Sequence, residues 1–274
     1  MKANVGFEFR LATLDPNGNC TKGINRIPTY KTYVADDEAK IISWDRSKYF
    51  NIWIARNLID CTAGRAYSPA LADIIPQFDG LLILHDYVGR IGTGNSFTSL
   101  MMIHEIGHYF NLDHTWGPVN DPGVVCGDDG VQDTPITKGH SSCNYLYDSV
   151  CTGAIENVQN FMEFSYCNKM FTLGQKDRMI LALNSPVAER NHLITQSTLD
   201  STGVLLPRPD CQPIADFNSV IRFKCLDGTF NFKDYSYNDT IDQLQWNFGN
   251  GAIATSTTAA SSSVKYSTSG WKDV

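Results

Sequence analysis

The segment His104–Trp116, HEIGHYFNLDHTW, constrains the fold more than any other part of the chain. It contains three of the six histidines, at positions 104, 108 and 114, and Glu105 follows the first of them. His and Glu are rare in this chain, so chance would produce H-E-x-x-H with a further His six residues later in below ~0.01% of such sequences. A helix with solvated histidines is the alternative interpretation, and the geometry below argues against it.

Helix geometry brings His104 and His108 to one face. Residues four apart lie ~40° apart around the helix and ~6 Å apart along it, so the two imidazoles can bind one zinc ion at ~2.0–2.1 Å. Glu105 is rotated by ~100° from His104. Its carboxylate can therefore reach a water molecule on the metal without becoming a ligand, which is the general-base position of H-E-x-x-H proteases.

His114 can join this site only if the helix ends near Asn111 and the chain turns back. Helices often end with a residue in the left-handed conformation, usually Gly and sometimes Asn, and Asn111 stands at the required place. Three neutral imidazoles leave a zinc ion one open position. A site of this kind lowers the pKa of bound water to about 7.

The pattern H-E-x-x-H-x-x-N-x-x-H resembles the metzincin signature, with Asn111 in place of the usual glycine. Metzincins carry a methionine turn beneath the metal, and NFMEF at Asn160–Phe164 supplies one. FEFRLATLDPNGN near the start, DDGVQDTP at Asp128–Pro135 and MFTLGQ at Met170–Gln175 narrow the resemblance to the pappalysin/cytophagalysin branch of secreted metalloproteases. Several separated motifs in the right order make this resemblance specific.

The resemblance implies a zinc-dependent endopeptidase that hydrolyses a protein or peptide substrate. It implies three zinc ligands, namely His104, His108 and His114. Glu105 would be the catalytic general base, and Met162 would pack beneath the ligands as the methionine of the turn. One departure is Phe164, because relatives often have a tyrosine there whose hydroxyl lies near the metal. Tyr166 is a candidate to replace that hydroxyl.

The fold class expected from pattern and resemblance is α+β. The catalytic domain would be metzincin-like, with a twisted mixed sheet, the zinc helix and an irregular lower half crosslinked by disulfides. Alternation and β-forming residues predict strands at 4–12, 49–58 and 79–88. Helices are predicted at 36–45, 97–111 and 173–184.

Eight cysteines indicate an oxidising compartment. Four of them follow the zinc helix, namely Cys126, Cys143, Cys151 and Cys167, and spacing alone allows three pairings among them. The resemblance implies the pairs Cys126–Cys151 and Cys143–Cys167. For the other four cysteines the pairing is a guess, Cys20–Cys61 and Cys211–Cys225.

The turn DDGVQDTP concentrates hard oxygen donors that suit Ca²⁺. The candidate calcium ligands are Asp128, Asp129, Asp133 and Thr134, and the resemblance also implies calcium in this region. The alternative is a solvated acidic turn shaped by its Gly and Pro residues. Calcium here would stabilise the fold and take no part in chemistry.

The net charge of −7 and the absence of a basic run predict no nucleic-acid partner. No apolar stretch approaches ~18 residues, so we expect no membrane span, and we expect a monomer. The cysteines and the resemblance predict secretion from a bacterial cell. Residues 1–10 lack the apolar core of a signal peptide. The resemblance implies a signal and a pro-segment, and both are expected to be missing from this sequence.

Three regions are predicted: a metzincin-type domain at 1–196, a Ser, Thr, Gly and Pro-rich linker at 197–212, and a β-rich domain at 213–274. The short strands of the last region suit an immunoglobulin-like sandwich. WNFGNG at Trp246–Gly251 and YSTSG at Tyr266–Gly270 resemble a PKD module, a spacer or adhesion unit. We expect it to be incomplete, because the chain stops at Val274 inside the last expected strand.

The sequence has two alternative functional interpretations. One is an inactive protease-like domain kept for binding, with the PKD-like module as the working part; the intact ligand pattern and Glu105 argue against it. The other is an aminopeptidase whose third zinc ligand is a glutamate further along the chain. His114 makes such a ligand unnecessary, and Glu156 lies in the wrong sequence context.

Overall fold

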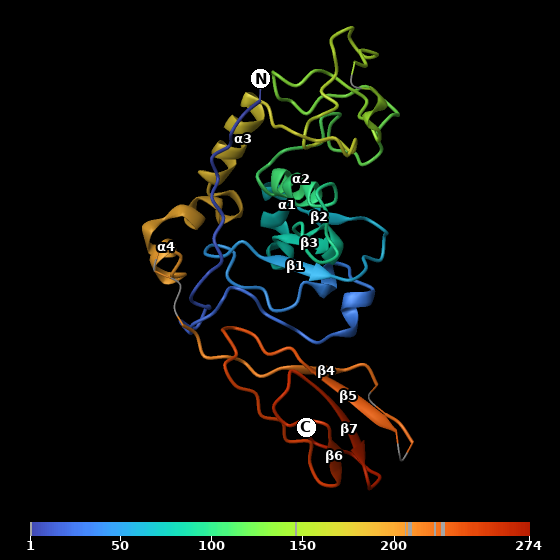
Figure 1. Ribbon diagram of the computed structural model, residues 1–274. Helices are drawn as coiled ribbons and strands as arrows, with labels where there is room; N and C mark the ends of the chain where they lie inside the picture. Colours follow the sequence, from blue (N-terminus) through green and yellow to red (C-terminus); the bar gives the residue numbers. More distant parts are fainter. Residues whose placement is uncertain (1, 146, 206, 208–209, 222, 226–227) are drawn as a thin grey trace. The chain divides into compact units, whose positions relative to one another are not determined.

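The computed structural model describes residues 2–145, 147–205, 207, 210–221, 223–225 and 228–274. The chain divides into two compact units, shown in Figure 1: Met1–Arg10 with Arg26–Thr202, and Leu11–Asn25 with Gly203–Val274. The segment Leu11–Asn25 lies inside the range predicted for the first domain but belongs to the second unit. Residues 206, 208 and 209 of the predicted linker lie outside the described residues.

The first unit contains a three-stranded mixed sheet with the order β1-β3-β2. β1 (Ile52–Ala55) pairs in parallel with β3 (Leu81–Leu84), and β2 (Gly64–Ala66) pairs with β3 in antiparallel fashion. β3 is the central strand, and three of its residues, Leu81–Ile83, are fully buried, as expected of an apolar strand covered on both faces. The predicted strands at 49–58 and 79–88 are therefore confirmed as shorter elements.

Four α-helices are found among the described residues: α1 (Pro69–Ile74), α2 (Leu100–Tyr109), α3 (Leu173–Leu183) and α4 (Gln196–Ser201). Short 3₁₀ segments lie at Tyr30–Tyr33, Asp37–Ala39, Pro76–Phe78, His85–Tyr87, Cys143–Tyr145 and Val187–Ile194. The helices predicted at 97–111 and 173–184 are confirmed as α2 and α3. α3 begins with a complete capping box, in which Thr172 and Gln175 each satisfy the other's backbone N–H.

Two predicted elements are wrong. In place of a strand at 4–12, the structure has one bridge, Ala3 to Phe171. Gly6 has φ +78°, which interrupts a strand, and Phe7 packs edge-on against Phe110. In place of a helix at 36–45, a single 3₁₀ turn spans Asp37–Ala39. The turn ends there because the next residue, Lys40, is buried and held by contacts with other segments, which are described below.

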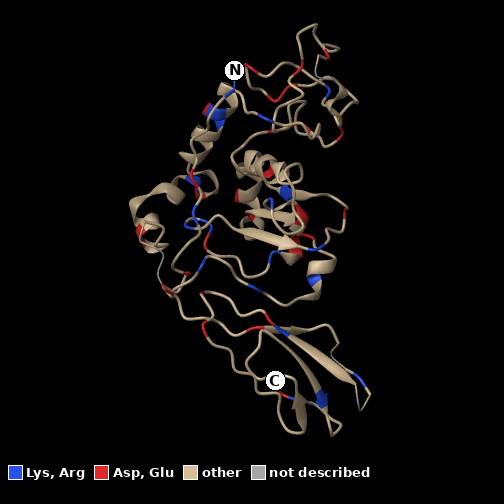
Figure 2. Cartoon of the chain, viewed as in Figure 1, with Lys and Arg blue, Asp and Glu red and all other residues tan. Residues whose placement is uncertain are grey.

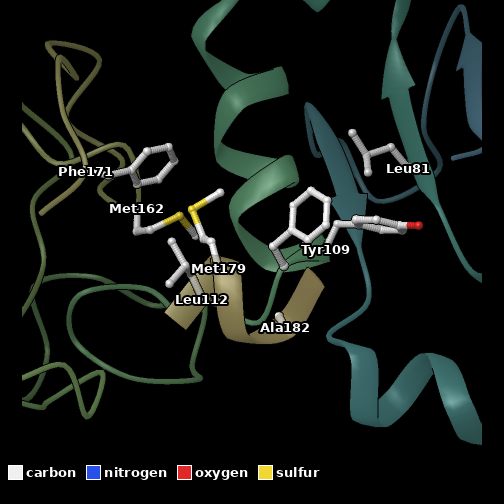
Figure 3. Close-up of a cluster of buried hydrophobic side chains, with 8 residues drawn as sticks. Leu81, Tyr109, Leu112, Met162, Phe171, Met179 and Ala182 are labelled. Carbon is white, nitrogen blue, oxygen red and sulfur yellow. The ribbon is translucent and has the colours of Figure 1, made fainter. Parts of the chain in front are cut away.

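The main core joins the sheet to the segments that follow α2. In Figure 3, Leu81 of β3 lies on one side of α2, while Met162 and Met179 lie on the other. Both methionines are at most 1% exposed. α2 therefore has packed neighbours on both flanks, and this packing fixes the helix that carries the first two histidines.

The span between α2 and α3, yellow-green in Figure 1, contains only the 3₁₀ turn Cys143–Tyr145 among its described residues. Two disulfides crosslink it, Cys126–Cys151 and Cys143–Cys167, which are the pairs that the resemblance implied. The guessed pairs of the other cysteines are wrong. Cys20 bonds Cys211, while Cys61 and Cys225 are free and exposed. Cys20 and Cys211 are far apart in sequence but lie in the same unit, which local spacing could not reveal.

The second unit contains one four-stranded antiparallel sheet with the order β4-β5-β7-β6. Its strands are β4 (Phe217–Ser219), β5 (Thr229–Asp234), β6 (Ala252–Ala254) and β7 (Ser261–Tyr266). Phe232, Phe248, Val264 and Tyr266 form its small core. Its described residues form this single sheet, whereas a sandwich requires two.

None of the helices in the described ranges is long and apolar enough to cross a membrane. Figure 2 shows basic and acidic residues interspersed along the chain rather than gathered on one element.

Candidate metal centre

α2 is positioned by a capped turn at its start. In the turn that precedes α2, the side chain of Asn95 accepts the backbone N–H of Phe97 at 2.8 Å and that of Thr98 at 3.0 Å, while Ser99, directly before the helix, makes no side-chain cap. The helix proper then runs from Leu100 to Tyr109 and carries His104 and His108 one turn apart.

The helix ends as the sequence predicts. Asn111 has φ +69°, the left-handed conformation that Asn tolerates better than most residues. The N–H of Leu112 donates to Gly107 O at 2.9 Å, and that of Asn111 donates to His108 O at 2.9 Å. These two bonds form a Schellman-type ending, and the reversal brings His114 back toward the helix.

The three imidazoles meet through their Nε2 atoms. The Nε2 of His108 lies 3.1 Å from that of His104 and 3.2 Å from that of His114, and the three atoms lie within 4.8 Å of one another. Two ligands that share one tetrahedral zinc at 2.0–2.1 Å are expected about 3.3–3.4 Å apart. The spacing therefore fits one ion held by all three.

Each imidazole is oriented by a hydrogen bond at its other nitrogen. The Nδ1 atoms of His104, His108 and His114 lie 2.7, 2.7 and 2.9 Å from the carbonyl oxygens of Phe161, Leu112 and Val119. A carbonyl can only accept, so each Nδ1 carries the proton and donates it. Each Nε2 is then an unprotonated donor atom for a metal, the arrangement by which proteins fix the tautomer of a ligating histidine.

Burial keeps these histidines neutral. His104 and His114 are each 4% exposed. Burial is the main cause that lowers the pKa of all three, well below the ordinary value for His104 and to about 3 for His114. Neutral imidazole is the form that binds a metal, so the protein presents ready ligands at neutral pH.

Met162 packs directly beneath α2. It is fully buried, and a Cβ placed on Gly107 would meet its sulfur at 2.4 Å. A helix-interior glycine costs about 1 kcal/mol relative to alanine. Here Gly107 leaves the space that the sulfur fills, one residue before His108. Met162 and the helix that carries His104 and His108 are therefore in direct contact.

Glu105 lies between α2 and β2. It is 5% exposed, and its carboxylate accepts the backbone N–H of Ala66. A Cβ on Gly64 would approach its side chain to 3.2 Å, so the absence of a side chain there gives the carboxylate room. Burial raises the pKa of Glu105 to about 8, although Lys40 and the Ala66 N–H act in the opposite direction. A carboxyl group with a pKa near neutrality can both take and release a proton.

Lys40 is the charged group near Glu105 that sequence reasoning missed. It is 5% exposed, and its Nζ donates to Phe78 O at 2.7 Å and pairs with Asp37 at 3.1 Å. Tyr67 donates its hydroxyl to the other oxygen of Asp37. No local motif marks this network, because its members come from separate segments.

Phe164 occupies the side of the centre where a hydroxyl was expected from relatives. Its ring centroid lies 5.4 Å from that of His104 and 4.9 Å from that of His114. The ring thus contributes an apolar wall to the histidines. Tyr166 is 54% exposed with φ +62°, and the ring contacts found among the described residues connect Phe164, not Tyr166, to the histidines.

The four predicted calcium ligands are used in protein hydrogen bonds. Asp129 accepts from Thr134 at 2.5 Å and from the N–H of Val131 at 2.9 Å. Asp133 accepts the hydroxyl of Thr172 at 2.6 Å and lies at the start of α3. Asp128 accepts the Gly130 N–H at 2.6 Å. The structure thus uses these oxygens to cap turns and a helix, and it does not bring them together as one ligand set among the described residues.

Residues 33–184, more than half of the chain, match the family model Peptidase M43, described as pregnancy-associated plasma protein-A. An extracellular metalloprotease of Trichophyton verrucosum is 29% identical over 189 residues, which cover 65% of this chain and 64% of that protein. One from Neurospora crassa is 33% identical over 139 residues, covering 48% and 47%. The chain thus spans less than two thirds of the length of these curated relatives.

Solved structures give the same picture. Mature mirolysin of Tannerella forsythia, in complex with a cleaved peptide, has a TM-score of 0.66 at 29% identity and covers 76% of this chain and 80% of its own. A promirolysin mutant has a TM-score of 0.65 at 28% identity, covering 75% and 70%. The pappalysin resemblance seen in the motifs is confirmed. The chain belongs to peptidase family M43, the pregnancy-associated plasma protein-A family of metalloproteases.

Proposed function

We propose that the protein is a secreted zinc endopeptidase that hydrolyses internal peptide bonds of proteins or peptides. The observation that carries this proposal is the convergence of three unprotonated Nε2 atoms, with Glu105 buried next to the first ligand. His104, His108 and His114 would hold the zinc ion. Their spacing, neutral state and carbonyl partners fit that ion.

Zinc, when bound, polarises the scissile carbonyl and lowers the pKa of water. The chain supplies the remaining steps. Glu105 takes the proton of the attacking water on its carboxylate and delivers it to the leaving amine, which is a general acid–base role. Burial of the carboxylate between α2 and β2 fixes its position. Phe164 excludes water from one side of the histidines.

The finer assignments rest on the family and the sequence. Secretion is supported by the extracellular relatives and by three disulfides. The domain ranges 1–196, 197–212 and 213–274, the incomplete PKD-like sandwich and the monomeric state stay predictions. So do the lack of a nucleic-acid partner and calcium at Asp128–Thr134.

The decisive experiment removes the carboxylate of Glu105 and keeps its shape. We expect Glu105→Gln to lower kcat/KM by roughly 10²–10⁴-fold while its zinc content, measured by mass spectrometry, stays at the wild-type level. Cleavage is followed with quenched fluorescent peptides that are blocked at both ends, so that only an endopeptidase produces a signal.

Two variants complete this test. His114→Ala should lose the zinc ion of this centre and the activity, whereas Glu8→Gln, at an exposed position, should lose neither. A zinc-loaded wild type that cleaves nothing, and that Glu105→Gln matches in every property, would favour the alternative of a protease-like binding domain.

A further inference from the structure

A second group of metal-ligating side chains converges in the span between α2 and α3. The Nε2 of His140 lies 3.4 Å from Oδ2 of Asp148 and 3.4 Å from Oε2 of Glu156. One ligand atom from each residue lies within 4.8 Å of the others. Ligands that share one zinc ion are expected about 3.3–3.5 Å apart, so these separations match. The cluster uses none of the residues of the histidine centre or of the Asp128–Thr134 turn.

The charge of the cluster is unbalanced without a cation. A third carboxylate, Glu163, places Oε2 3.4 Å from Nδ1 of His140. The side chains of Glu156 and Glu163 are fully buried, and that of Asp148 is 16% exposed. Within the part of the chain that the structure describes, none of the three forms an ion pair with a lysine or arginine. Buried carboxylates require a compensating charge.

A proton on His140 and a divalent ion are the two candidates for that charge. A proton brings one positive charge against three carboxylates. A divalent ion brings two and contacts two of the carboxylates directly, so it balances the cluster better.

We propose that His140, Asp148 and Glu156 form a second, structural site for a divalent transition-metal ion of the zinc type. One imidazole nitrogen with two carboxylate oxygens is a donor set that suits zinc, while Ca²⁺ prefers oxygen ligands alone. Glu163 faces the other ring nitrogen, as carboxylates behind ligating histidines do in zinc proteins.

The site would stabilise the region that presents the third zinc ligand. Glu163 accepts the backbone N–H of His140 at 2.7 Å, and it also accepts the hydroxyl of Thr115. Thr115 follows His114, and Glu163 follows Met162. An ion at His140 would thus hold Thr115 and Glu163, the residues that follow His114 and Met162. This stabilisation would occur whether or not the protein cleaves peptides.

The test counts metal ions in the whole chain. Protein stripped with chelator, reloaded with Zn²⁺ and dialysed should retain about two zinc ions, measured by mass spectrometry. Asp148→Asn should retain about one and weaken the second site by at least roughly tenfold. His104→Ala/His108→Ala should also retain about one, and adding Asp148→Asn should remove it. Asp121→Asn, an exposed aspartate of the same span, should behave as wild type.

A second readout guards against misfolded variants. In the His104→Ala/His108→Ala background, Zn²⁺ should raise the unfolding temperature, and it should no longer do so once Asp148→Asn or Glu156→Gln is added. Equal zinc content with and without Asp148→Asn overturns the proposal, as does Asp148-dependent protection by Ca²⁺ alone. If the histidine centre binds no zinc, the zinc content shows it in a different way. The wild type would then hold one zinc ion, and Asp148→Asn would remove that ion.

Discussion

The two parts of the first unit that meet at the histidine centre are stabilised in different ways. The part that ends with α2 buries mainly apolar side chains, including the whole of Leu81–Ile83. The span that follows α2 buries many polar side chains instead: Thr115, Asp129, Thr134, Thr137, His140, Glu156, Asn160, Glu163 and Ser165. It also has two disulfides and almost no regular structure.

This difference shows how the centre combines two kinds of support. Helix periodicity alone places His104 and His108, because they are one turn apart on α2. His114 comes from the irregular span, and its position depends on the reversal at Asn111 and on the Val119 carbonyl. All three imidazoles are oriented by carbonyl partners, but two of the histidines lie on a helix held by apolar packing, whereas the third lies in a span held by hydrogen bonds and crosslinks.

The largest effect is expected from a substitution that tests whether apolar packing alone stabilises the part of the first unit that ends with α2. Arg190 is fully buried and makes a two-pronged ion pair with Asp79, at 2.7 Å for both bonds. Arg190→Met would leave the buried carboxylate of Asp79 with only its longer ion pair to Arg46, at 3.9 Å, and we expect a loss of about 3–5 kcal/mol in unfolding free energy. Urea unfolding measures it. Arg90→Met, at an exposed position, is the control and should be neutral; equal behaviour of the two would contradict the assignment.

A smaller effect is expected from the crosslinks of the irregular span. Cys126→Ala/Cys151→Ala removes a disulfide that closes a separation of 25 residues. We expect a loss of about 2–4 kcal/mol, together with weaker zinc binding, since His114 lies near this loop. Cys61→Ala removes an exposed free thiol and should leave the unfolding midpoint unchanged. If zinc affinity survives the loss of the disulfide, hydrogen bonds alone position His114.

The contact between the two parts can be tested at Gly107. A methyl group there would meet the sulfur of Met162, so Gly107→Ala should cost about 1–3 kcal/mol through overpacking. The same substitution in a Met162→Ala background should cost less, because the sulfur is gone. Thermal unfolding of the four proteins gives the coupling. If the losses in stability of Gly107→Ala and Met162→Ala simply add in the double variant, then the methyl group at position 107 and the side chain of Met162 do not compete for this space.

The smallest effect concerns the reversal itself. Asn111 has φ +69°, so Asn111→Ala should cost about 1–2 kcal/mol for a left-handed alanine, whereas Asn111→Gly should not destabilise. Chemical unfolding distinguishes them. A destabilised glycine variant would mean that the Asn side chain, and not its backbone freedom, is what the site requires.

Sequence reasoning was strongest where one local pattern decides the structure. The spacing of His104 and His108, the left-handed Asn111 and the helix at α3 follow from rules that act within a few residues. It failed at 4–12, where side chains pack on Phe110 without forming a strand, and at 36–45, where buried Lys40 pairs with Asp37. The Cys20–Cys211 bond spans 191 residues, a separation that no spacing rule covers.

The parts of the centre that patterns could not predict are backbone atoms and distant neighbours. The carbonyls of Phe161, Leu112 and Val119 orient the imidazoles, and a carbonyl leaves no mark in a sequence. The cluster of His140, Asp148 and Glu156 could not be predicted from the sequence for a related reason. Its members are separated by eight residues at each step and have no regular element to bring them together.

The packing of Met162 under Gly107 has a consequence for synthesis of the chain. Domains are made from the amino end onward, so α2 is complete long before the residue that supports it emerges. Until position 162 has been added, the helix lacks the sulfur on its underside and His104 lacks the carbonyl that orients it. During synthesis the histidine centre therefore lacks two of its supports until the residues of the span after α2 have been added.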